Sequence, residues 1–208
     1  MPPALAPVLT TAIFDLGKVV IDWDQRHLYR DLIPEPETME HFLAHVLTDT
    51  SRERVDAGEP AAASVARLAA LHPAQAGLIR AYYEQFNRTM RGPVAGMVPL
   101  LETLKARGVR LFALSNWGVE TFPLARRHFG FLDLFEDIVI SGAVKLLEPD
   151  PRIYRLALDR FAVRADEAVF IDDMPANVAA AESVGLTAIR FTGADDLAAR
   201  LRSFGLLP

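Results

Sequence analysis

Residues 11–17 read TAIFDLG, a short apolar run that ends in an acid, Asp15, and a glycine, Gly17. Further short apolar runs follow along the chain, and each gives way to polar or small residues: 109–114 (VRLFAL), 137–140 (DIVI), 168–171 (AVFI) and 186–191 (LTAIRF). Runs of this kind are typical of parallel strands that are covered on both faces. We therefore interpret residues 11–17 as the first strand of a parallel sheet with its exit turn.

Helical patterns alternate with these strands, at residues 98–107, 121–129, 151–161, 175–184 and 194–204. Such alternation predicts an α/β fold, a Rossmann-like three-layer core in which helices cover both faces of a parallel sheet. Sheets of this type bind ligands at the carboxyl ends of their strands. The strand ends are therefore where functional side chains are expected.

The segment 25–91 breaks the alternation. It contains helical stretches separated by proline and glycine, at residues 27–32, 37–47, 61–71 and 74–90. We interpret it as an α-helical cap inserted after the first strand. The predicted core domain then comprises residues 1–20 and 93–208, and the predicted cap domain residues 21–92. The alternative, in which these helices only cover one face of the sheet, stays open.

Composition excludes several classes of protein. The 208 residues contain no cysteine, so disulfides, thiolate metal sites and cysteine nucleophiles are excluded. The net charge of -5 and the lack of a basic block argue against a nucleic-acid partner. No apolar run is long enough for a membrane span, and the proline-interrupted start does not resemble a signal peptide. We expect a cytoplasmic protein, either a monomer or a homodimer.

Polar side chains gather at the predicted strand ends: Asp15, Ser115, Asn116, Asp172 and Asp173. Carboxylates that converge from two strands repel each other unless a cation such as Mg²⁺ lies between them. A hydroxyl, an amide and backbone N–H groups can hold the oxygens of an anion. Together these groups suit phosphoryl transfer to a carboxylate. The alternative for each of them is an ordinary turn or helix-capping role.

The order of the motifs resembles the haloacid dehalogenase superfamily of hydrolases with a small helical cap. The matching segments are 12–24 (AIFDLGKVVIDWD), 111–117 (LFALSNW), 140–158 (ISGAVKLLEPDPRIYRLAL) and 169–189 (VFIDDMPANVAAAESVGLTAI). Within the superfamily, the first two segments resemble sugar-phosphate phosphatases and the amino-terminal phosphatase domain of soluble epoxide hydrolases. The resemblance covers nearly the whole chain.

The resemblance implies a Mg²⁺-dependent phosphatase that hydrolyses a small organic phosphate through an aspartyl-phosphate intermediate. Its partner would be a small phosphorylated metabolite, with a sugar phosphate as one candidate. Asp15 would be the nucleophile and a metal ligand, together with the carbonyl of Gly17. Asp173 would bind the metal directly, and Asp172 mostly through water or outer contacts. Ser115 and Asn116 would bind phosphate.

The chain departs from the family pattern at two positions. Gly17 stands where many family phosphatases carry an aspartate as general acid and base, so water, the leaving group or a cap residue must supply the proton. Glu148 stands where the family normally has a lysine, and we predict that Lys145 contacts the phosphate instead. Two alternatives stay open: Glu148 turns outward with reduced activity, or the protein is a weakened or inactive binder of a phosphorylated ligand. A 2-haloacid dehalogenase is a further alternative, which the pair Asp172–Asp173 disfavours.

Overall fold

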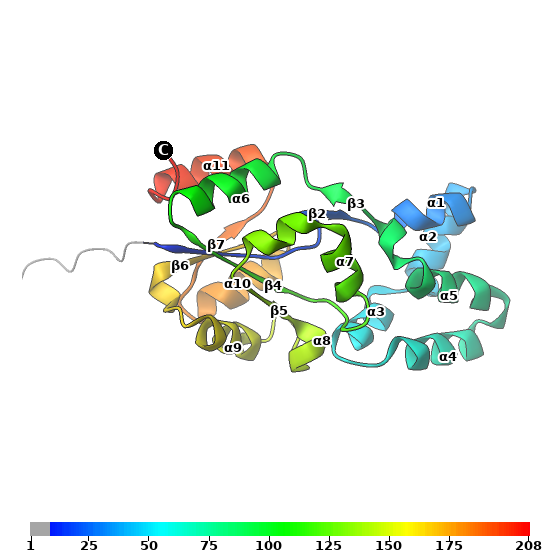
Figure 1. Ribbon diagram of the computed structural model, residues 1–208. Helices are drawn as coiled ribbons and strands as arrows, with labels where there is room; N and C mark the ends of the chain where they lie inside the picture. The colour runs from blue at the N-terminus through cyan, green and yellow to red at the C-terminus, as the bar shows by residue number, and fades with distance from the viewer. Residues whose placement is uncertain (1–8) are drawn as a thin grey trace, which may run out of the picture.

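The computed structural model describes residues 9–208, which form a central parallel sheet flanked by helices. The five strands lie in the order β5-β4-β1-β6-β7 (Figure 1). Their bounds are Thr11–Phe14 (β1), Arg110–Ser115 (β4), Asp137–Ile140 (β5), Ala168–Asp172 (β6) and Thr187–Arg190 (β7). The first eight residues of the predicted core domain, and the interpretation of the N-terminus as lacking a signal peptide, lie outside the described residues.

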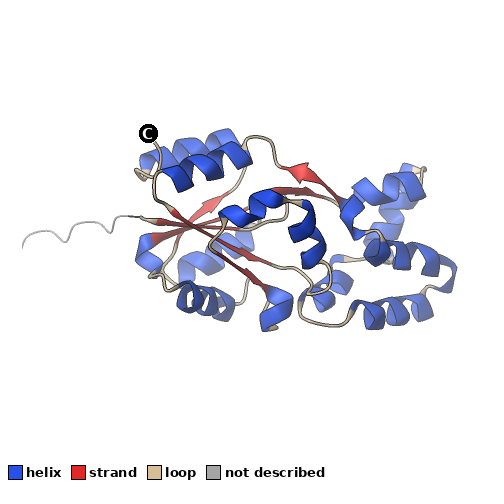
Figure 2. Ribbon diagram, in the orientation of Figure 1, coloured by secondary structure: helices blue, strands red, loops and turns tan. Residues whose placement is uncertain are grey.

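Helices cover both faces of this sheet (Figure 2). On one face lie α6 (Met97–Ala106) and α11 (Ala194–Ser203), and on the other lie α9 (Pro151–Phe161) and α10 (Pro175–Ser183) (Figure 1). Each face has its own core of buried side chains. The predicted Rossmann-like three-layer α/β fold is confirmed.

The central strand β1 is apolar at three of its four positions, Ala12, Ile13 and Phe14. All four of its residues are buried. Ala12 and Phe14 belong to the core beneath α6 and α11, whereas Ile13 belongs to the core beneath α9. Successive side chains of a strand point to opposite faces, so a strand covered on both sides has no position that faces solvent. Its first residue, Thr11, is polar and is buried as well.

The helical insertion begins and ends at a small antiparallel pair, β2 (Ile21–Trp23) and β3 (Met90–Pro93). Between these strands lie α1 (Arg26–Leu32), α2 (Pro36–His45), α3 (Asp49–Asp56), α4 (Ala61–Leu71) and α5 (Ala76–Glu84). The inserted helices lie beyond the end of the five-stranded sheet rather than on either of its faces (Figure 1). We call them the cap; the domain boundaries at residues 20/21 and 92/93 stay a prediction.

The structure differs from the sequence prediction in two parts of the cap. Helix α3 was not predicted, because its sequence DTSRERVD has almost no apolar residues and no helical period. The predicted helix over 74–90 ends at Glu84, a 3₁₀ turn follows over Phe86–Thr89, and Met90 begins β3. Pairing with β2 therefore takes the chain out of the helical conformation.

Two short helices complete the core, α7 (Phe122–His128) and α8 (Ser141–Val144). Across residues 9–208, none of the helices combines the length and the apolar character that a membrane crossing requires.

Candidate active site

The carboxyl ends of β1, β4 and β6 bring the predicted site residues together. Because β1 pairs in parallel with both β4 and β6, its end lies between theirs. Asp15, Asp172 and Asp173 each offer a carboxylate oxygen, and these three oxygens all lie within 4.8 Å of one another. Ser115 joins them, since its hydroxyl donates a 2.7 Å hydrogen bond to Oδ1 of Asp15.

Asp15 is almost fully buried, and its backbone N–H donates to the carbonyl of Ile171 at 2.9 Å. Burial raises the pKa of Asp15 well above its ordinary value, and the neighbouring Asp172 raises it further. The hydrogen bond from Ser115 opposes this rise. The site therefore favours a cation beside Asp15, because a cation stabilises the ionised form that can act as a nucleophile.

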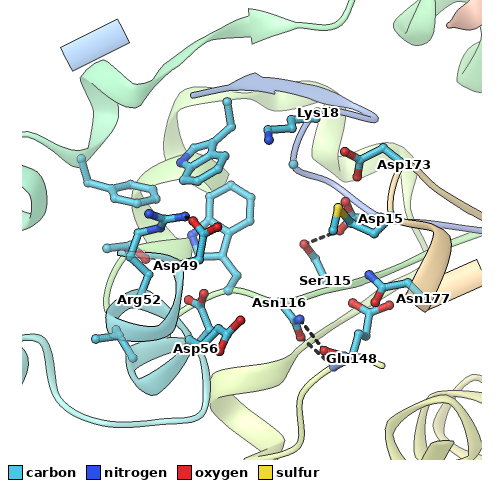
Figure 3. Close-up of a pocket in the computed structure, with 18 of the residues that line it drawn as sticks. Asp15, Lys18, Asp49, Arg52, Asp56, Ser115, Asn116, Glu148, Asp173 and Asn177 are labelled. Atoms are coloured by element: carbon cyan, nitrogen blue, oxygen red, sulfur yellow. Dashed lines mark hydrogen bonds and ion pairs between the residues drawn. The ribbon is translucent and has the colours of Figure 1, made fainter. Parts of the chain in front are cut away.

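The two acids of the fourth motif have different surroundings. Asp172 accepts hydrogen bonds at both oxygens, from the backbone N–H of Met174 at 2.6 Å and from Nδ2 of Asn177 at 2.9 Å. It lies behind the cavity wall, and burial raises its pKa to about 6. Asp173 is half-buried and lines the cavity beside Asp15. Burial raises the pKa of Asp173, and the ammonium group of Lys18 opposes that rise (Figure 3).

Asn116 holds the loop that carries Glu148. Its Nδ2 donates to the carbonyl of Glu148 at 3.0 Å, and its Oδ1 accepts from the N–H of Glu148 at 2.9 Å (Figure 3). These two bonds engage Oδ1 and one of the two N–H groups of the side-chain amide that was expected to bind phosphate. The second N–H of Nδ2 and the backbone N–H of Asn116 are the donors left for an anion.

Glu148 does not turn outward. Its side chain is 5% exposed and lines the same cavity as Asp15. Neither of its carboxyl oxygens has a hydrogen-bond partner within residues 9–208. Burial raises the pKa of Glu148 well above its ordinary range, and the charges of Asp15 and Asp172 add to that rise. The alternative in which Glu148 turns outward is therefore wrong. The raised pKa favours the protonated form of its carboxyl.

Lys145 does not reach this cavity. It is exposed at the end of α8, and its side chain lies against Gly58 of the cap. Among the described residues, the basic side chains that line the cavity are Lys18 and Arg52. Sequence reasoning missed both: Lys18 lies inside the first motif, directly after Gly17, and Arg52 belongs to the helix that was not predicted. Six acids line the same cavity, so it is strongly acidic overall: Asp15, Asp49, Glu53, Asp56, Glu148 and Asp173.

The cavity lies between the strand ends and the cap, with a volume of about 280 Å³. Five aromatic residues, which we call the aromatic wall, line it: Trp23, Tyr82, Tyr83, Phe86 and Trp117. The rings contact one another: Tyr82 and Phe86 have centroids 5.5 Å apart, and Phe86 and Trp117 have centroids 5.9 Å apart. The site thus has a carboxylate cluster at the strand ends and, on the cap side, aromatic rings together with the acids Asp49, Glu53 and Asp56 of α3. Such a site suits a ligand with one polar and one apolar part.

The comparisons with known proteins agree with this architecture. Residues 9–185 match the haloacid dehalogenase-like hydrolases, and the chain belongs to this family. The sesquiterpene phosphatase astK of Aspergillus oryzae is 30% identical over 187 residues, which cover 87% of this chain and 89% of that protein. The (S)-2-haloacid dehalogenase 1 of a Pseudomonas species is 30% identical over 93 residues, 45% of this chain and 41% of the dehalogenase.

Solved structures show the same fold. A haloacid dehalogenase (HAD) family enzyme from Bacteroides thetaiotaomicron, in complex with magnesium and inorganic phosphate, superposes on this chain with a TM-score of 0.69 at 20% identity. The match covers 89% of this chain and 95% of that enzyme.

The donor set fits a hard divalent cation. The three clustered ligands are all carboxylates, the oxygen donors that Mg²⁺ prefers. Burial and mutual repulsion raise the pKa of Asp15, and a bound cation would remove that penalty. The backbone of Gly17 also lines the cavity.

Proposed function

We propose that this protein is a Mg²⁺-dependent phosphatase that hydrolyses a small organic phosphate through an aspartyl-phosphate on Asp15. The observation that carries the proposal is the cluster of Asp15, Asp172 and Asp173, whose oxygens lie within 4.8 Å of one another. The hydroxyl of Ser115 lies beside it at 2.7 Å from Asp15. A phosphatase among the relatives that covers most of the chain supports the same chemistry.

Each residue of the cluster has a distinct task in this proposal. Asp15 attacks phosphorus, and Ser115 orients the attacking carboxylate through its hydrogen bond. Asp15, Asp173 and the carbonyl of Gly17 would hold Mg²⁺, which would neutralise charge between the nucleophile and a phosphate oxygen. Asp172 would act on the metal through water or outer contacts, because both of its oxygens already accept hydrogen bonds from Met174 and Asn177.

The phosphate oxygens need donors and a positive charge. We assign the donors to the backbone N–H and the second side-chain N–H of Asn116, because the one proton of the Ser115 hydroxyl is donated to Asp15. We propose that Lys18 contacts the phosphate in place of Lys145. Lys18 lines the cavity and lies near Asp173. Its Nζ lies 5.9 Å from the ring centroid of Trp23, a spacing compatible with a cation–π contact that holds the ammonium over the cavity.

The aromatic wall favours an ester whose alcohol part is apolar. Rings such as Tyr82, Phe86 and Trp117 bury apolar surface well and offer few hydrogen bonds to sugar hydroxyls. An isoprenoid or aryl phosphate fits this wall better than the sugar phosphate that the motifs suggest. The sesquiterpene phosphatase among the relatives agrees with this preference.

A panel of esters tests the proposal. The panel contains an isoprenoid monophosphate, an aryl phosphate and several sugar phosphates, each assayed for phosphate release with Mg²⁺ and with a chelator. A 2-haloacid, assayed for halide release, represents the dehalogenase alternative. We expect Mg²⁺-dependent phosphate release, fastest from the apolar esters. Halide release without metal, or binding of phosphate esters without turnover, would contradict the proposal.

A further inference from the structure

One acid of the cap lies over the site without a part in the chemistry described so far. Asp56 is the last residue of α3 and lines the same cavity as Asp15, Gly17 and Ser115. Figure 3 shows Asp56 on the cap side of the cavity, with Asn116 between it and Glu148. A leaving group that points from the phosphate toward the cap would pass beside this carboxyl.

Hydrogen bonds fix the position of Asp56 relative to the loop after β4. The hydroxyl of Ser141 donates to the backbone carbonyl of Asp56 at 2.6 Å. The same hydroxyl accepts a hydrogen bond from the backbone N–H of Trp117 at 3.0 Å. Ser141 therefore connects the end of the cap helix to the loop that carries Ser115 and Asn116. A residue held in this way can act repeatedly at one geometry.

The surroundings of Asp56 keep a proton on it near neutral pH. Burial raises the pKa of Asp56 to about 7. Glu53 of the same helix adds to the rise, while Arg52 and the backbone N–H of Gly118 oppose it. Tyr82 and Tyr83 of α5 also face it. A carboxyl with this pKa can both give and take a proton near neutral pH.

Position 17 offers no side chain to supply this proton from the side of the nucleophile. Gly17 stands where the family resemblance implies an aspartate in many phosphatases. A Cβ built on Gly17 would meet no atom within 4 Å, so within residues 9–208 no neighbour fills that space. Asp56 lines the cap side of the cavity, where a carboxyl can face a leaving group that points toward the cap.

We propose that Asp56 is the general acid and base of the reaction, acting from the cap in place of a side chain at position 17. This inference rests on the proposed phosphatase function. When Asp15 attacks phosphorus, the ester P–O bond breaks and its electron pair goes to the leaving oxygen, which takes the proton of Asp56. The Asp56 carboxylate then removes a proton from the water that attacks the aspartyl-phosphate. Inorganic phosphate leaves, and Asp15 is restored as a carboxylate.

Leaving-group dependence tests this assignment. The p-nitrophenolate ion leaves without a proton, whereas an alkoxide does not. We expect Asp56→Asn to lower kcat/KM for an alkyl phosphate by about 10²–10⁴-fold, the usual contribution of a general acid. For p-nitrophenyl phosphate, kcat/KM of the same variant should fall by less than about tenfold, because kcat/KM reports the attack of Asp15 on phosphorus and this leaving group needs no proton. Its turnover of this ester also shows that the variant is folded.

Two further variants make the test specific. Asp49→Asn removes another acid of α3 that lines the cavity, and it should change the alkyl and aryl esters by the same factor. Asp56→Glu keeps a proton donor on the cap, and it should retain more alkyl-ester activity than Asp56→Asn. In the wild type, kcat/KM for the alkyl ester should fall as the pH rises above about 7, and Asp56→Asn should lose this dependence.

Equal losses for the two esters in Asp56→Asn, or a pH dependence that persists in it, would overturn the assignment while leaving the phosphatase function intact. A wild type that releases no phosphate from either ester would overturn both proposals.

Discussion

The half-buried carboxyl of Asp56 is expected to make the stability of the fold depend on pH. Its pKa is raised from an ordinary value of 3.8 to about 7. Below pH 3.8 the residue is protonated in both the folded and the unfolded chain, so it does not change the free energy of unfolding. Between the two values the unfolded chain releases the proton while the folded chain keeps it, so stability falls as the pH rises. Above about pH 7 the loss is complete.

The size of this effect follows from the same difference. A tenfold change in a protonation equilibrium is worth about 1.4 kcal/mol, so the full difference corresponds to about 4 kcal/mol. Asp56 is half-buried rather than sealed from water, which reduces the expected value to about 2 kcal/mol. The side chain in Asp56→Asn does not ionise, so this contribution to the pH dependence of stability is absent from the variant. We therefore expect the variant to gain about 2 kcal/mol relative to the wild type between about pH 4 and pH 8.

Urea unfolding of the metal-free protein at several pH values measures this gain. The free energy of unfolding of Asp56→Asn minus that of the wild type should increase across the interval. Thr50→Ala, at an exposed position of the same helix that carries no ionisable group, is the matched control and should show a constant difference. A constant difference for Asp56→Asn as well would refute the argument that burial raises the pKa of Asp56.

Three other substitutions test the core of the site. Asn177→Ala removes the 2.9 Å hydrogen bond to Asp172 and should weaken Mg²⁺ activation by about 10–100-fold, measured as the Mg²⁺ concentration for half-maximal rate. Ser115→Ala removes the 2.7 Å hydrogen bond to Asp15 and should lower kcat/KM by about 10–100-fold, a loss of about 1.4–3 kcal/mol of transition-state stabilisation. Glu148→Lys places a cation in an acidic cavity and should raise turnover by about tenfold or more; an unchanged rate would show that Glu148 is no deficit.

The core fold was predictable because its signals are local. Each strand is a short apolar run, and each following helix carries an apolar period or a proline at its start. In α9, Asp150 caps the helix by accepting from the N–H of Arg152, and Pro151 follows, as the sequence Asp-Pro suggests. The convergence of Asp15 and Asp172 also followed, since adjacent parallel strands end at one edge.

The cap side of the site was not predictable to the same extent. Helix α3 carries Arg52 and Asp56 but lacks the apolar period that identifies helices, because it contributes mainly polar groups to the cavity. The one available signal was Thr48, whose side chain accepts from the N–H of Ser51 at the start of the helix.

The orientation of Glu148 depends on contacts between distant segments. Its loop is held by Asn116, which lies 32 positions earlier in the chain. Spacing in the sequence therefore did not decide whether Lys145 or Glu148 faces Asp15. The same holds for Lys18, whose place beside Asp173 follows from the pairing of β1 with β6.

Capture of the covalent intermediate tests the central claim most directly. The wild type is mixed with a ³²P-labelled ester and Mg²⁺, quenched in acid, and the label is mapped by borohydride reduction, which converts an aspartyl-phosphate to homoserine. We predict a hydroxylamine-sensitive label, homoserine at position 15, and no label in Asp15→Asn. Turnover by the wild type without a label at Asp15, or a labelled Asp15→Asn variant, would contradict the account.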